Sequence, residues 1–258
     1  MMKLVTYNIW NSDVNYNERM DLLLTLLKEE DIDVLALQEV RDENLVEKIK
    51  KECSFQDYYW KEYPDCHEGL AILSKYPIIN SCTNWDGTDM IHNSGIMNVS
   101  LKLQSCVIGV TNVHLDYKHS YNREIEIVKA IKEVEKDLEM DYNFILGDFN
   151  TYPDSVIHNY LTGKQSLFSH STSWIDLAEV FSRRKGSKIE PTLDFYNNPR
   201  WDNQYTLDIP GRFDWILIKS PYPKESPKLC DYRLIGTERR NGVTASDHYG
   251  ALCGIDFS

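Results

Sequence analysis

Apolar and polar positions alternate with period two in several short segments of the chain, a pattern typical of half-buried β-strands. The first is "KLVTYNI", close to the N-terminus. The other predicted strands cover residues 33–40, 69–78, 96–103, 107–115, 143–148, 212–219 and 248–256. We expect 96–103 and 107–115 to pair antiparallel, because only a short polar turn separates them. The strand over 69–78 is predicted to end at Pro77.

Other segments place their apolar residues at helical spacing. The leucines between Glu18 and Glu30 predict an amphipathic helix, and Asn17 is the expected N-cap. Further helices are predicted over residues 43–52 and 122–139, with helical stretches near 154–161 and 176–182. Residues 185–211 are rich in Pro, Asn and Asp and predict a long functional loop. Strands with intervening helices and antiparallel pairs indicate a mixed α/β fold of two packed sheets flanked by helices.

Polar residues occupy the same end of several predicted strands. Four apolar stripes finish in a polar group at their C-terminal end, at Asn8, Glu39, His114 and the pair Asp148 and Asn150. Two late strands have the reverse order, and the polar group comes first, at Asp214 and at Asp247 with His248. If these late strands run antiparallel to the first four, all six polar ends meet at one rim of the sheets.

Each of these residues also has a plain structural explanation. The alternatives are a turn at Asp148 and Asn150, a loop-bonding Asn8, a solvated strand end at Glu39, a hydrogen-bonded core imidazole at His114, a salt bridge from Asp214 to Arg212, and a turn at "SDH". The convergence of all of them at one rim favours a functional site over these separate explanations.

Four carboxylates in one site would repel each other: Glu39, Asp148, Asp214 and Asp247. Two unit charges about 4 Å apart cost on the order of 4 kcal/mol at an effective dielectric of about 20. Such a cluster needs a cation, and oxygen ligands suit Mg²⁺ or Mn²⁺ better than zinc. The six cysteines are scattered without a CxxC pair, which argues against a zinc site or a disulfide framework.

Composition adds limits on location and partners. The chain of 258 residues is 42% hydrophobic and 26% charged, as in ordinary globular proteins. It has no apolar run of about 18 residues and no signal-peptide layout, so we expect a cytoplasmic protein without a membrane span. Its net charge of −12 predicts either a small substrate or a metal that supplies positive charge locally, although acidity can also serve solubility alone.

Seven motifs together resemble one known family. "TYNIW", "LQEV", "EGLAILSKYPI", "TNVHLD", "GDFN", "RFDWILI" and "SDHYG" are similar, in this order, to the signature of the endonuclease/exonuclease/phosphatase (DNase I-like) superfamily. That family includes pancreatic-type deoxyribonuclease, abasic-site endonucleases, inositol polyphosphate 5-phosphatases and neutral sphingomyelinases. The resemblance implies a four-layer α/β sandwich, a single domain over residues 1–258, and a Mg²⁺-dependent phosphoester hydrolase.

The resemblance also implies roles around a metal and its water. Glu39 would be the principal Mg²⁺ ligand, with Asn8 and Asp247 close to the metal or its waters. Asp148 would orient or deprotonate the attacking water. Asn150 would hold the phosphate and the nucleophile.

Further roles implied by the resemblance concern histidines and their partners. His248 would contact a phosphate oxygen and stabilise the transition state, and Asp214 would orient a catalytic histidine. His114 stands where many members carry a second active histidine, a candidate general acid or phosphate ligand. Glu68 would pair with His114 and keep it protonated.

The motifs do not choose the substrate. "PTLDFYNNPRWDNQ" and "SDHYGALCGIDFS" resemble the tyrosyl-DNA phosphodiesterase-like branch, which removes tyrosyl adducts from DNA 5′-ends, so a phosphodiesterase acting on nucleic acid or nucleotides ranks first. The acidic charge favours the second candidate, a phosphatase of inositol phosphates, sugar phosphates or nucleotides. A non-catalytic phosphate-binding scaffold ranks third, because the polar set is complete. We expect a monomer.

Substrate choice is expected to lie in four loops, near residues 53–67, 82–95, 116–121 and 185–211. Their aromatic residues either stack on bases or pack the loops down; they are Tyr58, Tyr59, Trp60, Trp85, Tyr117, Tyr121, Tyr196, Trp201 and Tyr205, with His92 beside them.

Overall fold

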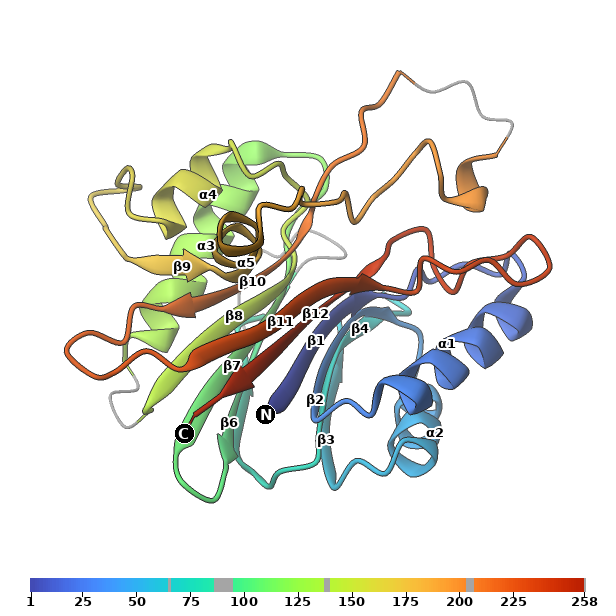
Figure 1. The fold of residues 1–258 in the computed structure, drawn as a ribbon, viewed down its shortest axis with the longest axis horizontal. Helices are drawn as coiled ribbons and strands as arrows, with labels where there is room; N and C mark the ends of the chain where they lie inside the picture. Colours follow the sequence, from blue (N-terminus) through green and yellow to red (C-terminus); the bar gives the residue numbers. More distant parts are fainter. Residues whose placement is uncertain (65, 86–94, 137–139, 203–206, 258) are drawn as a thin grey trace.

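Two six-stranded sheets pack against each other, with helices on the outer face of each (Figure 1). The computed structural model describes residues 1–64, 66–85, 95–136, 140–202 and 207–257. Between the sheets lies one apolar core, to which both contribute buried side chains such as Leu4 and Ile72 from one sheet and Val110 and Leu146 from the other. The predicted four-layer α/β sandwich is therefore confirmed.

The first sheet has the strand order β11-β12-β1-β2-β4-β3. Its strands are β1 (Met2–Asn8), β2 (Val34–Val40), β3 (Asp57–Glu62), β4 (Gly69–Ser74), β11 (Lys228–Ile235) and β12 (Gly250–Asp256). β1 runs parallel to β2 and antiparallel to β12. Helices α1 (Tyr16–Glu30) and α2 (Glu43–Glu52) cover its outer face with buried leucines and isoleucine.

The second sheet has the order β5-β6-β7-β8-β10-β9. Its strands are β5 (Ile78–Thr83), β6 (Gly95–Lys102), β7 (Val107–His114), β8 (Tyr142–Asp148), β9 (Trp174–Asp176) and β10 (Asp214–Lys219). β7 runs parallel to β8, and β10 antiparallel to it. Helices α3 (Ser120–Val134) and α4 (Val156–Leu161) pack on its outer face, and α5 (Leu177–Lys185) lies against β10 and β11.

These directions confirm the expected reversal of the late strands. In each sheet the two strands that end in polar residues are parallel neighbours, and the late strand that begins with polar residues is antiparallel to one of them. The antiparallel pair of β6 and β7 is also as predicted. All six polar strand ends therefore lie at the same rim.

Several sequence predictions were wrong in detail. The first helix begins at Tyr16, because Asn15 takes a left-handed backbone (φ 49°) and its carbonyl accepts the Arg19 amide; no side chain caps it, so Asn17 is not the N-cap. The strand predicted over 69–78 ends at Ser74, where the Ser74 hydroxyl accepts the Tyr76 amide and turns the chain into β5 of the other sheet.

Further predictions concerned the long helix after residue 120, the cysteines and membrane spans. α3 starts at Ser120, two residues before the predicted start, and ends at Val134; residues 135–136 form a turn where helix was predicted, and the predicted end at 139 lies outside the described residues. None of the six cysteines, all within the described residues, forms a disulfide, and Cys106 and Cys253 are buried. Within the described ranges, no helix has the length and apolar character needed to span a membrane.

Candidate active site

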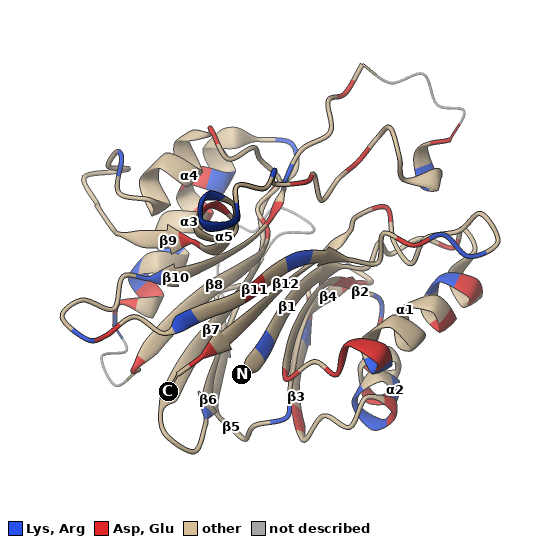
Figure 2. Cartoon of the chain, viewed as in Figure 1, with Lys and Arg blue, Asp and Glu red and all other residues tan. Residues whose placement is uncertain are grey.

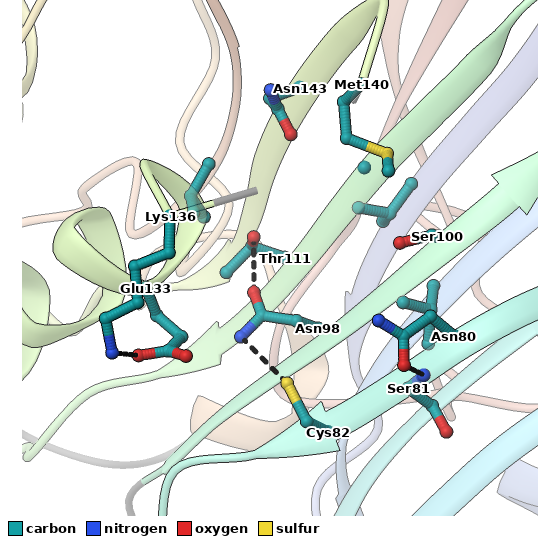
Figure 3. Close-up of a pocket in the computed structure, with 14 residues that line it drawn as sticks. Asn80, Ser81, Cys82, Asn98, Ser100, Thr111, Glu133, Lys136, Met140 and Asn143 are labelled. Carbon is teal, nitrogen blue, oxygen red and sulfur yellow. Dashed lines mark hydrogen bonds and ion pairs between the residues drawn. The ribbon is translucent and has the colours of Figure 1, made fainter. Parts of the chain in front are cut away.

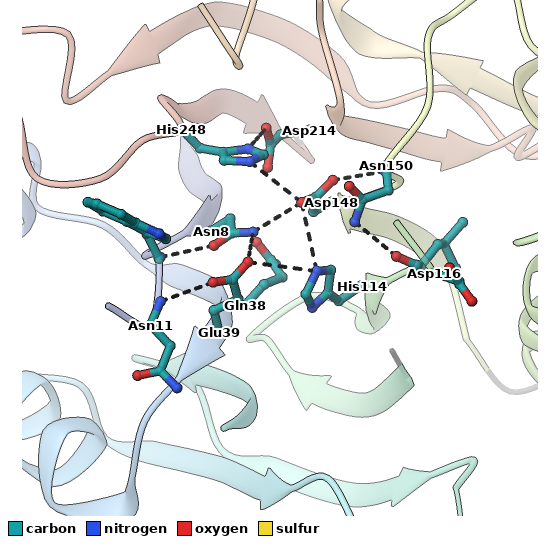
Figure 4. A network of polar contacts seen from close by, with 12 residues as sticks. Asn8, Asn11, Gln38, Glu39, His114, Asp116, Asp148, Asn150, Asp214 and His248 are labelled. Atoms are coloured by element: carbon teal, nitrogen blue, oxygen red, sulfur yellow. Dashed lines mark hydrogen bonds and ion pairs between the residues drawn. The ribbon is translucent and has the colours of Figure 1, made fainter. Parts of the chain in front are cut away.

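Polar strand ends of both sheets are linked in one network of hydrogen bonds and longer ion-pair contacts (Figure 4). Asn8, at the end of β1, links the two sheets: its Nδ2 donates to Glu39 Oε1 (2.9 Å) in its own sheet and to Asp148 Oδ2 (3.0 Å) in the other. Its Oδ1 accepts the Trp10 amide at 3.0 Å. One asparagine thereby fixes the relative position of two carboxylates from different sheets.

Glu39 is aimed at this network by an irregularity of its strand. The β2–β4 register shifts between Leu37 and Val40, and Glu39 has a left-handed backbone (φ 56°), which is uncommon for a residue other than glycine. Its Oε2 accepts the Asn11 amide at 3.0 Å. A strained residue with both carboxylate oxygens held is consistent with a functional position.

Asp148 lies at the centre of the network and is buried. Its Oδ1 accepts the Asn150 amide at 2.8 Å, and its Oδ2 is 3.8 Å from His248 Nε2 and 3.9 Å from His114 Nε2. Burial raises the pKa of Asp148; the His248 charge opposes the rise and the Asp214 charge adds to it. A carboxylate with a raised pKa is a better proton acceptor than an ordinary surface aspartate.

The backbone around Asp148 explains the "GDFN" motif. Gly147 has φ 142°, and a Cβ there would lie 1.9 Å from the Val113 carbonyl oxygen of the neighbouring strand. Only glycine permits this close approach. Asn150 has a left-handed backbone (φ 49°), and its Nδ2 donates to Leu115 O at 2.9 Å. The motif thus positions a carboxylate and an amide at the rim in place of an ordinary turn.

His248 and Asp214 form a buried pair, with His248 Nδ1 2.9 Å from Asp214 Oδ2. Burial alone would lower the pKa of His248, but the Asp214 and Asp148 charges outweigh it and raise this pKa well above its usual value. The imidazolium is therefore favoured at neutral pH. The alternative salt bridge from Asp214 to Arg212 does not form, because Arg212 pairs with Asp176 at 2.7 Å.

Asp247 faces the same site from the turn before β12. Its Oδ1 accepts the Ser246 hydroxyl at 3.2 Å. Burial raises the pKa of Asp247 to about 6; the His248 charge opposes this rise and the Glu39 charge adds to it. The Glu39 charge therefore disfavours ionisation of the Asp247 carboxyl.

The residues present suit a divalent cation held by oxygen atoms. Among the described side chains, ligand atoms of Asp148, Asp214 and His248 lie within 4.8 Å of one another. His248 is a poor metal ligand here, because its favoured form is the protonated imidazolium. The carboxylates of Glu39 and Asp247, with the amide of Asn8, are the oxygen donors that Mg²⁺ prefers, and a cation there relieves their repulsion.

His114 lies over the carboxylates, but with a different partner from the one predicted. Its Nε2 is 4.0 Å from Glu39 Oε1, and its Nδ1 is 3.4 Å from the Tyr63 hydroxyl. Glu68 is buried, and its Oε2 accepts Asn11 Nδ2 at 3.0 Å. Burial and then the Glu39 charge raise the pKa of Glu68, while Asn11 and His114 lower it. The hydrogen bond of Glu68 therefore goes to Asn11, and the His114 charge affects the pKa of Glu68 without a direct bond between them.

Sequence reasoning missed several residues that support the site. Gln38 Nε2 donates to Asn112 Oδ1 at 2.6 Å, and Asn112 Nδ2 donates to two carbonyls of the first sheet, so these amides join the sheets behind the site. In the sequence, Gln38 and Asn112 each interrupt an otherwise apolar strand, and this could have marked them. Thr192 Oγ1 accepts the Asp214 amide at 3.1 Å and Asn198 Nδ2 donates to Asp247 O at 3.1 Å. Both lie in the "PTLDFYNNPRWDNQ" segment, but no periodicity singles out these two residues within it.

The aromatic residues of the loops divide between packing and exposure. Trp85 is buried against Tyr63, with ring centroids 5.2 Å apart, and Trp201 lies against Phe195. Tyr117, Tyr121 and Tyr196 are exposed. His92 and Tyr205 lie outside the described residues. Among the described aromatic residues of these loops, the rings of Tyr117, Tyr121 and Tyr196 are exposed enough to meet a substrate without rearrangement.

Two hollows lie away from the rim. One, of about 470 Å³, is on the outer face of the second sheet, lined by polar side chains such as Asn98, Thr111 and Asn143 (Figure 3). The other, of about 720 Å³, lies between α5 and β11, beside Tyr249. Neither is lined by the carboxylates and histidines of the network, so the chemistry of the rim locates the site better than cavity size.

Comparison with known proteins agrees with this geometry. Residues 5–248 match the model of the Endonuclease/Exonuclease/phosphatase family. A search of curated proteins found no match. Similar solved structures include D. rerio TDP2 complexed with single strand DNA product, which is 18% identical, with a TM-score of 0.80 over 99% of this chain and 98% of that one.

Two further structures have the same fold. Truncated Caenorhabditis elegans TDP2 is 19% identical, with a TM-score of 0.76 over 99% of this chain and 97% of that one. An endonuclease/exonuclease/phosphatase from Bacteroides vulgatus is 14% identical, with a TM-score of 0.78 over 100% and 99%. The chain therefore belongs to the divalent-metal-dependent Endonuclease/Exonuclease/phosphatase family, and it is a hydrolase of phosphoester bonds.

Proposed function

We propose that the protein is a Mg²⁺-dependent phosphodiesterase that acts on nucleic-acid ends or nucleotides by in-line attack of water, with Mn²⁺ as a possible substitute metal. The observation that carries this proposal is the network in which Asn8 joins Glu39 to Asp148 beside the His248–Asp214 pair. It combines a carboxylate cluster that needs a cation with a cationic donor, as hydrolysis of a phosphate anion requires.

Glu39 and Asp247 would hold the metal, and Asn8 keeps Glu39 in place. When bound, Mg²⁺ would neutralise charge on the phosphate oxygens. Asp148 is the candidate acceptor of the proton from the attacking water, because its pKa is raised and its position is fixed by Asn8 and Asn150. Asn150 uses one N–H on Leu115 O, which leaves its second N–H for a phosphate oxygen.

The two histidines supply hydrogen-bond donors to the phosphate. The Nδ1 of His248 bonds Asp214, so its Nε2–H remains for a nonbridging oxygen whose charge grows in the transition state. His114 presents Nε2 to the same carboxylates, where it can donate to a phosphate oxygen or to the leaving group. Glu68 is proposed to influence His114 through its charge.

Two observations bear on the substrate. The fold match to a TDP2 structure that contains a single strand DNA product supports a nucleic-acid end. So does the resemblance of the "PTLD" segment to the tyrosyl-DNA phosphodiesterase-like branch; its Thr192 holds the backbone of Asp214. The net charge of −12 favours a small phosphorylated molecule as the second candidate, and Figure 2 shows acidic residues spread over most elements, with cations gathered on α5. Monomeric state and cytoplasmic location stay predictions.

The deciding experiment compares hydrolysis of bis-p-nitrophenyl phosphate and p-nitrophenyl phosphate with Mg²⁺ and after EDTA, followed by a panel of oligonucleotides and small phosphates. A phosphodiesterase hydrolyses the diester faster, and a phosphatase prefers the monoester. Oligonucleotide binding that weakens steeply with salt indicates a polyanionic substrate, because counterions are released. Mg²⁺ binding without turnover of any phosphoester would instead support the scaffold alternative.

A further inference from the structure

A short 3₁₀ helix, η1 (Pro199–Trp201), is fastened to the turn that carries Asp247. Asn198 is buried, and its Nδ2 donates to Ser246 O at 3.0 Å and Asp247 O at 3.1 Å. Its Oδ1 accepts the Arg200 amide at 3.0 Å and the Thr244 hydroxyl at 3.0 Å. The backbone of Arg200 is therefore fixed relative to the Asp247 side of the site.

The side chain of Arg200 is held between two indole rings. Its Cζ lies 4.7 Å from the ring centroid of Trp10 and 4.8 Å from that of Trp201. Trp10 follows the metal-site residue Asn8 by two positions, and its amide bonds Asn8 Oδ1. The orientation of the guanidinium is therefore set by the same turn that positions the site.

Arg19 stacks on Trp10 as well, with Cζ 4.5 Å from the ring centroid, and serves as a comparison. Its guanidinium is saturated by backbone carbonyls, those of Ile9, Trp10, Ser12, Val14 and Ala245. Arg19 is a structural cation that completes the turn. Among the described residues, no such set of acceptors surrounds the Arg200 guanidinium.

Arg200 carries unused hydrogen-bonding capacity. Its Nε is buried and has no hydrogen-bond partner, and no carboxylate among the described residues forms an ion pair with its guanidinium. A buried donor without a partner costs about 1–3 kcal/mol, so an absent acceptor is indicated.

We propose that Arg200 binds the substrate phosphate at the Asp247 side of the site, as a cation additional to His248. The inference rests on the proposed function and deepens it, because it names a residue that determines affinity for the phosphate. A guanidinium matches two phosphate oxygens with parallel hydrogen bonds, and ring stacking fixes it in advance, so little side-chain entropy is lost on binding.

The test measures binding of inorganic phosphate to the full chain at saturating Mg²⁺ by calorimetry. Arg200→Gln is expected to weaken this binding about tenfold or more, since a hydrogen bond to a charged group contributes roughly 1.5–3 kcal/mol. Arg184→Gln, at an exposed arginine on α5, is the matched control and should leave it within about twofold. Mg²⁺ affinity and the melting temperature without phosphate should stay close to wild type in both.

Unchanged phosphate affinity in Arg200→Gln overturns the proposal, and so does a loss no larger than that in Arg184→Gln. A loss of Mg²⁺ binding in parallel with phosphate binding also overturns it, because the stack would then be only structural. If Arg200→Gln does not fold, Arg200→Lys keeps the charge over the rings but lacks the paired donors; wild-type affinity in that variant contradicts the proposal. Wild-type protein that binds phosphate through Arg200 but hydrolyses no phosphoester supports this inference and refutes the proposed function.

Discussion

Glu39 combines a left-handed backbone with two held carboxylate oxygens, which makes it the residue whose charge the site most depends on. We predict that Glu39→Gln lowers kcat by about 10²–10⁴, because it removes the proposed metal ligand and with it a few kcal/mol of transition-state stabilisation. The glutamine keeps the shape, so circular dichroism should match wild type. Glu225→Gln, at an exposed glutamate, is the control; near-wild-type turnover of Glu39→Gln would refute the metal assignment.

Asp214 sets the protonation of His248, and its removal should appear in the pH profile. Because the Asp214 charge raises the pKa of His248, the imidazolium persists above the usual range. In Asp214→Asn this pKa falls, so the alkaline limb of kcat/KM should move to lower pH, and kcat/KM near pH 8 should drop about 10- to 100-fold. The profile of bis-p-nitrophenyl phosphate hydrolysis measures this. An alkaline limb at the wild-type position would mean that His248 does not act as a cation.

At the residue scale, the sequence predicted most of the rim because each residue terminates a patterned strand. Asn8, Glu39 and Asp148 could be placed in this way, since the side chain at a strand end follows from strand direction. Asn198 and Arg200 could not, because they lie in an irregular loop, where no periodicity relates a residue to its neighbours in space. The partner of Glu68 was likewise set by the turn at Asn11, which no pattern predicts.

At the element scale, the buried strands were predicted and the edge strands were not. β2 and β8 have long buried runs, whereas β3 is half-exposed along its length and β11 contains a register shift against β12. An edge strand with solvent on several sides shows no clear alternation, and a bulge breaks the period. The observed limits of helix α2 agree with the prediction. Its start is fixed by Asp42, whose side chain accepts the Leu45 amide.

Helix α5 depends on a buried ionic cluster that is separate from the site. Asp176 caps it and also bonds Arg212 and His158. Burial alone would raise the pKa of Asp176, but Arg212 and then His158 outweigh it and lower this pKa to about 2. A depressed pKa stabilises the fold above the unfolded value of about 3.9, and this contribution is lost as the pH falls toward 2.

We predict that wild type loses roughly 2 kcal/mol more unfolding free energy than Asp176→Asn between about pH 5 and pH 2.5. Near pH 7, the variant should be less stable by about 3–5 kcal/mol, because Arg212 keeps a buried charge without its partner. Urea unfolding at the two pH values measures both effects, with Asp154→Asn at an exposed aspartate as control. Equal pH dependence in wild type and Asp176→Asn would show that this cluster does not account for the acid sensitivity.

At the scale of the whole molecule, the residues of the site also connect the two sheets. Asn8 and Asn112 carry hydrogen bonds from one sheet to the other, and Glu39 and Asp148 approach from opposite sheets. The protein already has a net charge of −12, and this contact between the sheets brings the carboxylates of Glu39 and Asp148 close together. Repulsion between these carboxylates opposes packing of the sheets at the rim, and a cation at the proposed metal site would relieve it and thereby link metal binding to global stability.

Mg²⁺ should therefore raise the melting temperature of the whole protein. At a free concentration ten times its Kd, a ligand bound only by the folded state stabilises it by about 1.4 kcal/mol, or roughly 3–6 °C for a chain of this size. Glu39→Gln and Asp247→Asn should lose most of this shift, and EDTA should reverse it in wild type. KCl at matched ionic strength controls for screening of the surface charge. A shift of equal size with KCl, or in Glu39→Gln, would mean that Mg²⁺ acts on the general acidity of the protein and that the rim holds no specific cation.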